Sequence, residues 1–152
     1  MYIYIQKKST YEKNIFFTLV SIGFSLTACA QKIEASKVPA LVKESFTRQF
    51  PGVVPKWEKE DEKYEAGFKK AGQEMSVLFE ANGTIAELEM EIPVASLTEV
   101  IKSYINIHYK GAGIIGAAKI TLATGKIEYE AAIKGKDIIF DANGNFIKEV
   151  AD

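Results

Sequence analysis

The stretch Phe79-Glu80-Ala81-Asn82-Gly83 returns later in the chain as Phe140-Asp141-Ala142-Asn143-Gly144. Both copies end in Asn-Gly. Because asparagine and glycine both accept a positive φ, this dipeptide is the strongest short signal for a β-hairpin turn. Each copy therefore predicts the end of one strand and the start of the next.

Two further blocks recur in the same order around these turns, which chance rarely supplies. Tyr64-Glu65-Ala66-Gly67-Phe68 is echoed by Tyr129-Glu130-Ala131-Ala132-Ile133. The segment that begins Lys37-Val38-Pro39 and ends Phe50-Pro51-Gly52 is echoed by the one that begins Ser96-Leu97-Thr98 and ends Tyr109-Lys110-Gly111. The sequence therefore predicts a tandem repeat, with a first unit at residues 37–92 and a second at residues 93–152.

Each unit begins with apolar residues at helical spacing. Pro39 lies where a first-turn proline is tolerated, and Ser96 and Glu99 have the spacing of a capping box. The predicted shared face consists of Val38, Leu41, Val42, Ser45, Phe46 and Gln49 in the first unit and of Leu97, Val100, Ile101, Tyr104, Ile105 and His108 in the second.

Each helix is followed by short alternating segments between turn residues, the period-2 pattern of a meander. We therefore predict an α+β fold, a tandem repeat of two αββββ units, each a helix packed on an antiparallel meander sheet. The predicted strands are residues 54–59, 63–69, 74–79 and 84–91, then 118–122, 126–133, 136–140 and 146–150.

The second strand of each unit indicates which side of the sheet is buried. Tyr64, Ala66 and Phe68 alternate with glutamate and lysine, and the equivalent strand alternates in the same way. We expect the apolar side to face the helix. One helix covers only part of a four-stranded sheet, so the other side should be open to solvent or to a partner. The candidate binding residues on that open side are Glu58, Glu65, Glu128 and Glu130.

Residues 1–28 have the layout of an export signal peptide. Lys7, Lys8 and Lys13 precede an uncharged apolar run at residues 15–26. A helix over that run is too short to cross a hydrocarbon core of ~30 Å comfortably, which favours a signal peptide over a membrane span.

Cys29 is the only cysteine in the chain. Leu26-Thr27-Ala28-Cys29 resembles the lipobox of bacterial lipoproteins, so we expect cleavage before Cys29, acyl chains on it that hold the protein on a membrane, and a tether at residues 29–36. Cleavage after Ala30 is the alternative, and it would release a soluble protein.

Composition and motifs argue against several classes of function. A net charge of −1 with interspersed signs gives no cationic footprint for nucleic acid. The G-x-G-x-x-G match at residues 111–116 follows a predicted helix and precedes a strand, the reverse of the order that a nucleotide site requires.

Residues 141–145 resemble a calcium loop less than they resemble the hairpin turn at residues 80–83. His108 is the only histidine, and no serine lies in a nucleophile elbow. We expect no cofactor, no metal and no enzymatic activity.

Two remaining features are interpreted as structural. The glutamates at residues 58–65 and 87–91 are expected to be exposed surface charge, and exposed strand residues seldom acquire the shifted pKa that acid–base catalysis needs. Trp57, the only tryptophan, is matched with Ile120 of the second unit and assigned to the core.

The chain resembles the PepSY-like family of bacterial envelope proteins, also described as β-lactamase-inhibitor-like. The resemblance rests on Val38-Pro39, Phe50-Pro51-Gly52, Lys56-Trp57-Glu58, Tyr64-Glu65-Ala66, Phe79-Glu80-Ala81-Asn82-Gly83 and their second copies. It implies two αββββ units and a binding or inhibitory role, and it supplies no functional residues.

We expect an exported, non-catalytic binding module in the periplasm or at the cell surface. It would dock on an envelope protein, such as a peptidase or another hydrolase, and restrain or position it. A carrier with a small-ligand pocket between the two units is the alternative, and a hydrolase that uses the glutamate clusters is the third possibility.

Overall fold

The computed structural model describes residues 31–151 of the 152-residue chain. The predicted signal peptide and the predicted lipidation of Cys29 lie outside the described residues. No described helix is long and apolar enough to cross a membrane.

In each unit an α-helix is followed by four strands, as the repeat predicts, and the first unit has an additional strand before its helix. The described residues contain two α-helices and two 3-10 helices. Within each unit, the four strands after the α-helix follow one another with no helix between them. The first unit contains β1 (Gln31–Ile33), the 3-10 helix Ala35–Lys37, α1 (Ala40–Gln49), β2 (Lys56–Glu60), β3 (Lys63–Lys70), β4 (Gln73–Glu80) and β5 (Ile85–Glu91). The second contains the 3-10 helix Val94–Ser96, α2 (Glu99–His108), β6 (Gly116–Leu122), β7 (Ile127–Ile133), β8 (Lys136–Asp141) and β9 (Phe146–Ala151).

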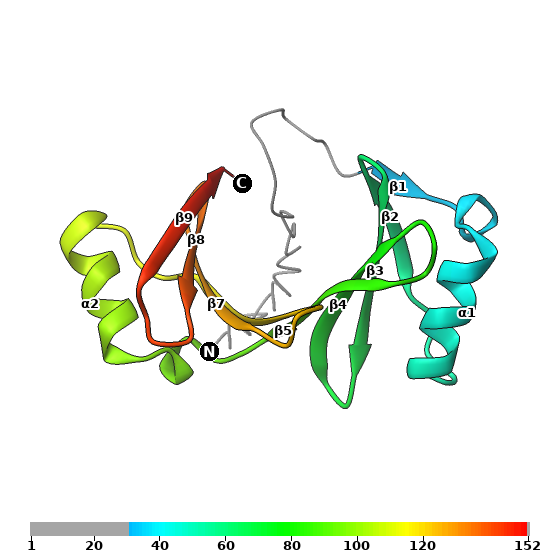
Figure 1. Ribbon diagram of the computed structural model, residues 1–152. Coiled ribbons are helices and arrows are strands. Elements are labelled where there is room, and N and C mark those ends of the chain that lie inside the picture. Colours follow the sequence, from blue (N-terminus) through cyan, green and yellow to red (C-terminus); the bar gives the residue numbers. More distant parts are fainter. Residues whose placement is uncertain (1–30, 152) are drawn as a thin grey trace, which may run out of the picture.

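The described strands form one nine-stranded antiparallel sheet in sequence order, so the α+β class and the meander are confirmed. The two units share this sheet because β5 pairs with β6, which sets Glu89 opposite Ile120. Figure 1 shows the sheet bending through β5–β7, with α1 and α2 on its outer, convex side. The side turned away from both helices, called here the concave face, is not covered by any described helix.

An aromatic cluster fills the space between α1 and the convex side of the first unit. The Phe46 ring of α1 lies 5.2 Å from the Phe68 ring, 5.6 Å from the Trp57 ring and 6.5 Å from the Phe79 ring, centroid to centroid. All four side chains are buried. Edge-to-face contacts of this kind add to the free energy gained from apolar burial.

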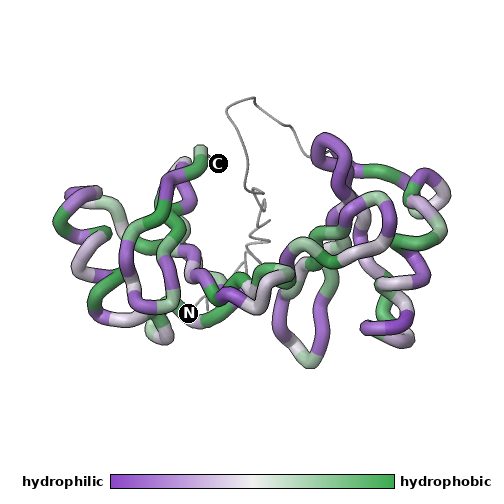
Figure 2. Tube along the Cα trace, in the orientation of Figure 1, coloured by the Kyte–Doolittle hydropathy of each residue, from purple (hydrophilic) through white to green (hydrophobic). Residues whose placement is uncertain are grey.

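The core of the second unit is built from smaller side chains. Ile101 and Ile105 of α2 are buried with Ala117, Ala131 and Phe140. Figure 2 shows hydrophobic and hydrophilic stretches interspersed along the chain in both units.

The core assignment of Trp57 is confirmed, but its match with Ile120 is wrong. Trp57 pairs with Ala66 in the first unit, and Ala131, the repeat equivalent of Ala66, pairs with Ala117. The equivalent of Trp57 is therefore Ala117. Ile120 has the opposite parity along β6, so it belongs to the concave face.

Several local predictions differ from the structure. The N-cap of α2 is Thr98, whose hydroxyl accepts a hydrogen bond from the Ile101 amide at 3.4 Å, and Ser96 ends the preceding 3-10 helix. Leu41 and Val100, expected on the buried face, are 56% and 57% exposed. Residues 31–33, assigned to the tether, form β1 and pair with β2. Pro39 is the N-cap of α1 and does not lie within its first turn.

Candidate functional site

Carboxylates collect in a row across the concave face. The strand register places Glu58 opposite Glu65, Ser76 opposite Glu89, Ala118 opposite Glu130, and Asp137 opposite Ala132. On their other sides Ser76 lies opposite Gly67 and Ala118 opposite Glu91, so the glutamates approach one another diagonally across the strands, as the charges of Glu130 and Glu65 acting on Glu89 indicate. We call Glu58, Glu65, Glu89, Glu130 and Asp137 the acidic row.

The expectation that these glutamates are open to solvent is wrong. Glu65 is 6% exposed, Glu89 8% and Glu130 3%. Side chains on the inside of a curved sheet converge, and the carboxylates lie among Leu78, Ile120 and Ile139, which are also buried. Of the predicted binding residues, only Glu58 keeps partial exposure, while Glu128 is 4% exposed.

Burial perturbs the acid–base chemistry of Glu65. The pKa of its carboxyl is raised from 4.5 to about 7, chiefly by loss of solvation and to a smaller extent by the nearby Glu58, Glu60 and Glu87. A hydrogen bond with the Ser76 side chain opposes this rise in pKa because it favours the charged form.

Glu89 lies at the centre of the acidic row, on β5. Burial raises its pKa well above the usual value, and Glu130, Glu65, Asp137 and Glu87 raise it further in that order. The four charged groups with the largest effects on Glu89 are therefore all acidic. The assignment of Glu89 to exposed surface charge is wrong for the same reason as for Glu65.

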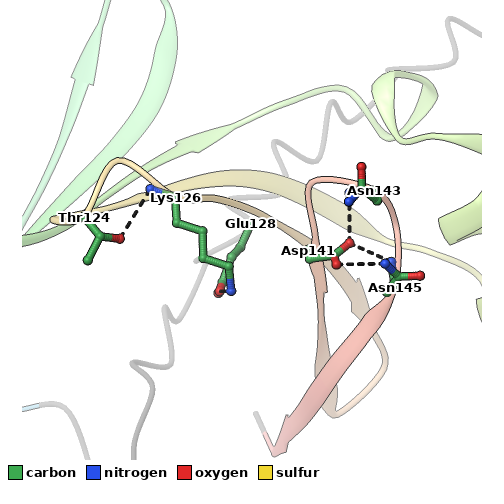
Figure 3. Close-up of polar contacts among 6 residues, drawn as sticks. All are labelled: Thr124, Lys126, Glu128, Asp141, Asn143 and Asn145. Atoms are coloured by element: carbon green, nitrogen blue, oxygen red, sulfur yellow. Dashed lines mark hydrogen bonds and ion pairs between the residues drawn. The ribbon is translucent and has the colours of Figure 1, made fainter.

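A second line of carboxylates on the same face has cationic partners. Lys126 Nζ lies 2.8 Å from Glu128 Oε1 (Figure 3). Burial raises the pKa of Glu87, and the positive charges of Lys63 and Lys148 oppose that rise. The Glu87 and Glu128 carboxylates on the concave face therefore lie near lysine side chains.

Residues 141–145 form a hairpin turn, as the repeat predicts. The Asp141 carboxylate accepts hydrogen bonds from the Asn143 amide at 2.8 Å, from the Asn145 amide at 2.9 Å and from Asn145 Nδ2 at 2.8 Å (Figure 3). These bonds lower the pKa of Asp141. Its oxygens are used to hold the turn between β8 and β9.

The structure places the four predicted binding residues on one face. The same face also contains Glu89 and Asp137, which the sequence does not single out as binding residues. Glu89 is hidden in the sequence among three alternating glutamates, of which only Glu91 is fully exposed. Asp137 is one polar residue in the apolar run of β8, and its parity with Ile139 is the signal that assigns it to the concave face.

The pKa shifts of Glu65 and Glu89 do not form the pattern of an acid–base pair with each other. Such pairs need environments that push two pKa values apart, so that one group is protonated while the other is charged. The pKa values of Glu65 and Glu89 are both raised, in each case chiefly by burial and then by neighbouring acidic groups.

Within residues 31–151, no group of three or more histidine, cysteine or acidic side chains is arranged to hold a metal ion. His108, at the end of α2, stacks on Tyr104 with ring centroids 4.1 Å apart.

A pocket of about 430 Å³ lies at the β1–β2 edge and is lined by residues 32–35 and 55–58. It belongs to the first unit, whereas the carrier alternative places a pocket between the units.

Known structures share this fold. A protein described as a putative periplasmic protein from Bacteroides eggerthii has a TM-score of 0.62 at 10% identity, over 75% of this chain and 88% of that one. A DUF2874 family protein from Bacteroides uniformis has a TM-score of 0.60 at 15% identity, over 74% of this chain and 88% of that one. A BLIP-like protein from Bacteroides fragilis has a TM-score of 0.56 at 19% identity, over 74% of this chain and 86% of that one. At these identities the likeness shows the fold alone.

A comparison with curated protein sequences gave no match. The family model described as putative beta-lactamase-inhibitor-like, PepSY-like matches the chain twice, over residues 25–87 and 72–148. These two matches cover both repeats and well over half of the sequence. The chain therefore belongs to the PepSY-like, putative beta-lactamase-inhibitor-like family.

Proposed function

We propose that this protein is a non-catalytic module of the bacterial envelope that binds another protein through the concave face of its sheet. The observation that carries the proposal is the curved sheet, whose helices both lie on the convex side (Figure 1). A concave surface of this breadth fits a protruding segment of a folded partner, because shape complementarity is what a specific interface requires. The family description, inhibitor-like, supports the same class of function.

The partner that this proposal favours is an envelope enzyme such as a peptidase or another hydrolase. Binding would restrain or position that enzyme by covering a projecting loop or helix. The pKa values of Glu65 and Glu89 support binding over catalysis, since both carboxyls shift in the same direction.

Site-specific crosslinking tests the docking face directly. Glu91 is exposed at the end of β5 and pairs with Ala118 of the concave face, whereas Glu99 is exposed on α2. A photo-crosslinking residue at position 91 of the full chain, irradiated in the native envelope, should form a discrete adduct with one partner protein. The same residue at position 99 should not.

The position 99 variant is the matched control, because both substitutions replace an exposed glutamate in the same fold. Equal adducts from both positions would show that contact is not specific to the concave face. Absence of any adduct from position 91, with the protein correctly located, would refute docking on this face.

The proposal also includes attachment to a membrane through lipid on Cys29. Replacing Cys29 with serine removes the thiol that would carry the acyl chains. Several acyl chains hold a protein on a bilayer almost irreversibly, at ~0.8 kcal/mol per buried CH₂. We therefore expect Cys29→Ser to move the protein from the membrane fraction to the soluble fraction, as followed by immunoblotting. A protein found in the soluble fraction both with and without the substitution would favour cleavage after Ala30.

A further inference from the structure

The last strand of the sheet, β9, has an outer edge that no described strand covers. The strand order places β9 beside β8 alone, and Figure 1 shows it at one end of the sheet. The strand at the other end, β1, has only three residues and contains Lys32, and both features protect a sheet edge from further pairing. β9 has six residues and begins with Phe146 and Ile147, which are 41% and 38% exposed. β9 is therefore the edge that can accept another strand.

The tandem repeat shows what covers an edge of this kind. Phe79 pairs with Ile85 in the first unit and Phe140 pairs with Phe146 in the second, each beside the same shift of register. β9 is therefore the repeat equivalent of β5. The outer edge of β5 is paired with β6 along most of its length in spite of that shift. The irregularity in β9 thus does not prevent it from pairing with a strand in the same way.

The β5–β6 pairing also shows which backbone groups of β9 are directed outward. The Ile92 amide donates a hydrogen bond to the Ala117 carbonyl at 2.9 Å. In an antiparallel pair every second residue exchanges hydrogen bonds with the neighbouring strand, so Leu88 of β5 also faces β6. Glu149 of β9 is the equivalent of Leu88, and Ala151 follows it by two residues. The backbone groups of Glu149 and Ala151 are therefore directed to the outer edge.

Two side chains of β9 indicate which residues a pairing strand should have. Lys148 and Val150 have the parity of the concave face, and both are half-buried. Glu89, the equivalent of Val150, is only 8% exposed, because Ile120 of β6 lies opposite it. A strand beside β9 would bury Val150 in the same way, which favours an apolar residue opposite it. Opposite charges on facing strands are stabilising and like charges are destabilising, so Lys148 favours an acidic residue opposite it.

A second copy of the chain fits this edge less well. Two β9 strands related by a two-fold axis place residues of the same parity opposite each other. Registers centred on the strand then set Lys148 against Lys148, or Glu149 against Glu149, and like charges that are directly opposite destabilise the pair. The strand that β9 accepts should therefore come from a different protein.

We propose that the partner protein supplies an extended segment that pairs antiparallel with β9 and continues the sheet by one strand. The segment has an apolar residue opposite Val150 and, two positions closer to its C-terminus, an acidic residue opposite Lys148. The inference rests on the proposed function and adds to it the chemistry of the partner segment, because a strand at this edge also extends the concave face. Main-chain hydrogen bonds supply affinity in this mode of recognition, and the side chains supply specificity.

A peptide made from β6 is the probe, because β6 covers the equivalent edge in the first unit. The peptide contains residues 116–123 with the substitution Leu122→Glu. In the register of β5 with β6, its Ile120 lies opposite Val150 and its new carboxylate lies opposite Lys148. The peptide is titrated into the full chain, which is labelled with ¹⁵N and extracted in detergent. Exchange of the backbone amides with solvent is followed by NMR.

The exchange rates identify the edge residue by residue. In the chain alone, the Glu149 and Ala151 amides should exchange faster than those of Lys148 and Val150, which are directed to β8. Addition of the probe should slow exchange at Glu149 and Ala151 about tenfold or more, because these amides acquire carbonyl partners. The amides of Lys148 and Val150 should change much less.

Two altered peptides make the test specific. With Leu122→Lys in place of Leu122→Glu, a second positive charge lies opposite Lys148, and the affinity should fall about fivefold. With Thr121→Pro added to the probe, the peptide lacks the amide that would donate to the Glu149 carbonyl, and the slowing of exchange should be lost.

Two variants of the chain extend the test to the partner in the native envelope. Glu149→Pro removes an amide that is not directed to β8, and it should weaken the adduct formed from position 91 about fivefold or more. Glu149→Ala keeps that amide and removes only the side chain that Tyr109 and Lys136 contact, so the adduct should persist. The amide spectra of both variants show whether the fold is intact.

An unchanged exchange rate at Glu149 in the presence of the probe, or equal affinities for the Leu122→Glu and Leu122→Lys peptides, would overturn the inference. Exchange at Glu149 that slows with the concentration of the chain alone would overturn it in favour of a second copy. Failure of the proposed function is a separate outcome. A position 91 adduct undiminished in Glu149→Pro would leave docking intact without the added strand. Slowed exchange with the probe, but no adduct from position 91, would refute docking on the concave face and leave β9 as an edge that binds a strand.

Discussion

Replacing Gly83 with alanine should lower the free energy of unfolding by about 3 kcal/mol, through two costs that add. Gly83 has a φ of +83°, a conformation that a residue with a Cβ rarely adopts. A Cβ at this position would also lie 2.6 Å from the Leu41 carbonyl oxygen. That oxygen belongs to the backbone of α1, so relief of the contact requires the helix itself to move. Urea unfolding followed by circular dichroism measures the change.

The repeat provides matched controls for this prediction. Gly144, the equivalent of Gly83, has a φ of +85°, but a Cβ there would meet the side chain of Val100 at 3.1 Å. A side chain yields more easily than a helix backbone, so Gly144→Ala should cost less. Gly72 has a φ of +85° with nothing within 4 Å of a Cβ, and Gly72→Ala should cost only the ~1 kcal/mol of the backbone strain. If Gly83→Ala were no more destabilising than Gly72→Ala, the close approach to α1 would have no energetic role.

Strand positions were predictable from the sequence because turn residues mark their ends. The predicted strand at residues 63–69 is β3, Lys63–Lys70, and the one at residues 136–140 is β8, Lys136–Asp141. The Asn-Gly turns mark the C-terminal ends of β4 and β8, at Glu80 and Asp141. Local chemistry determines these features, and local chemistry is what one sequence shows.

The joining of the two units into one sheet was not predictable in this way. The β5–β6 pairing connects Glu87–Glu91 with Ala118–Leu122 across the whole of α2. No turn signal specifies a contact between strands that a helix separates. The pairing follows from two exposed sheet edges that satisfy each other's backbone hydrogen bonds, which is a property of the assembled units.

The candidate site was predictable in part for a related reason. Side-chain parity correctly assigned Glu65 and Glu130 to the side opposite the helices, because alternation is a local property of a strand. Their burial depends on sheet curvature and on the neighbours Leu78 and Ile139, which come from other strands. Alternation therefore identified the face, while the perturbed pKa values depended on tertiary structure.

The buried carboxyls predict that the protein is more stable at pH 5 than at pH 8. Glu65 has a pKa of about 7 in the folded chain against 4.5 as the ordinary value. Between these values the folded state binds more protons than the unfolded state, so stability falls as the pH rises. A shift of this size corresponds to about 3 kcal/mol lost between pH 4.5 and pH 7. The raised pKa of Glu89 acts in the same direction.

Urea unfolding at several pH values between 5 and 8 measures this dependence. In Glu65→Gln the side chain cannot ionise, so the variant should unfold at a higher urea concentration than the unsubstituted protein at pH 8, and its stability should vary less with pH. Glu149→Gln should change the pH dependence of stability in the opposite direction. Hydrogen bonds from Lys136 and Tyr109 lower the pKa of Glu149, so its contribution is present at neutral pH and lost as the pH falls through its folded value. Stability that rose steadily from pH 5 to pH 8, or a Glu65→Gln variant with an unaltered pH dependence, would show that the Glu65 carboxyl is not held in a desolvated site.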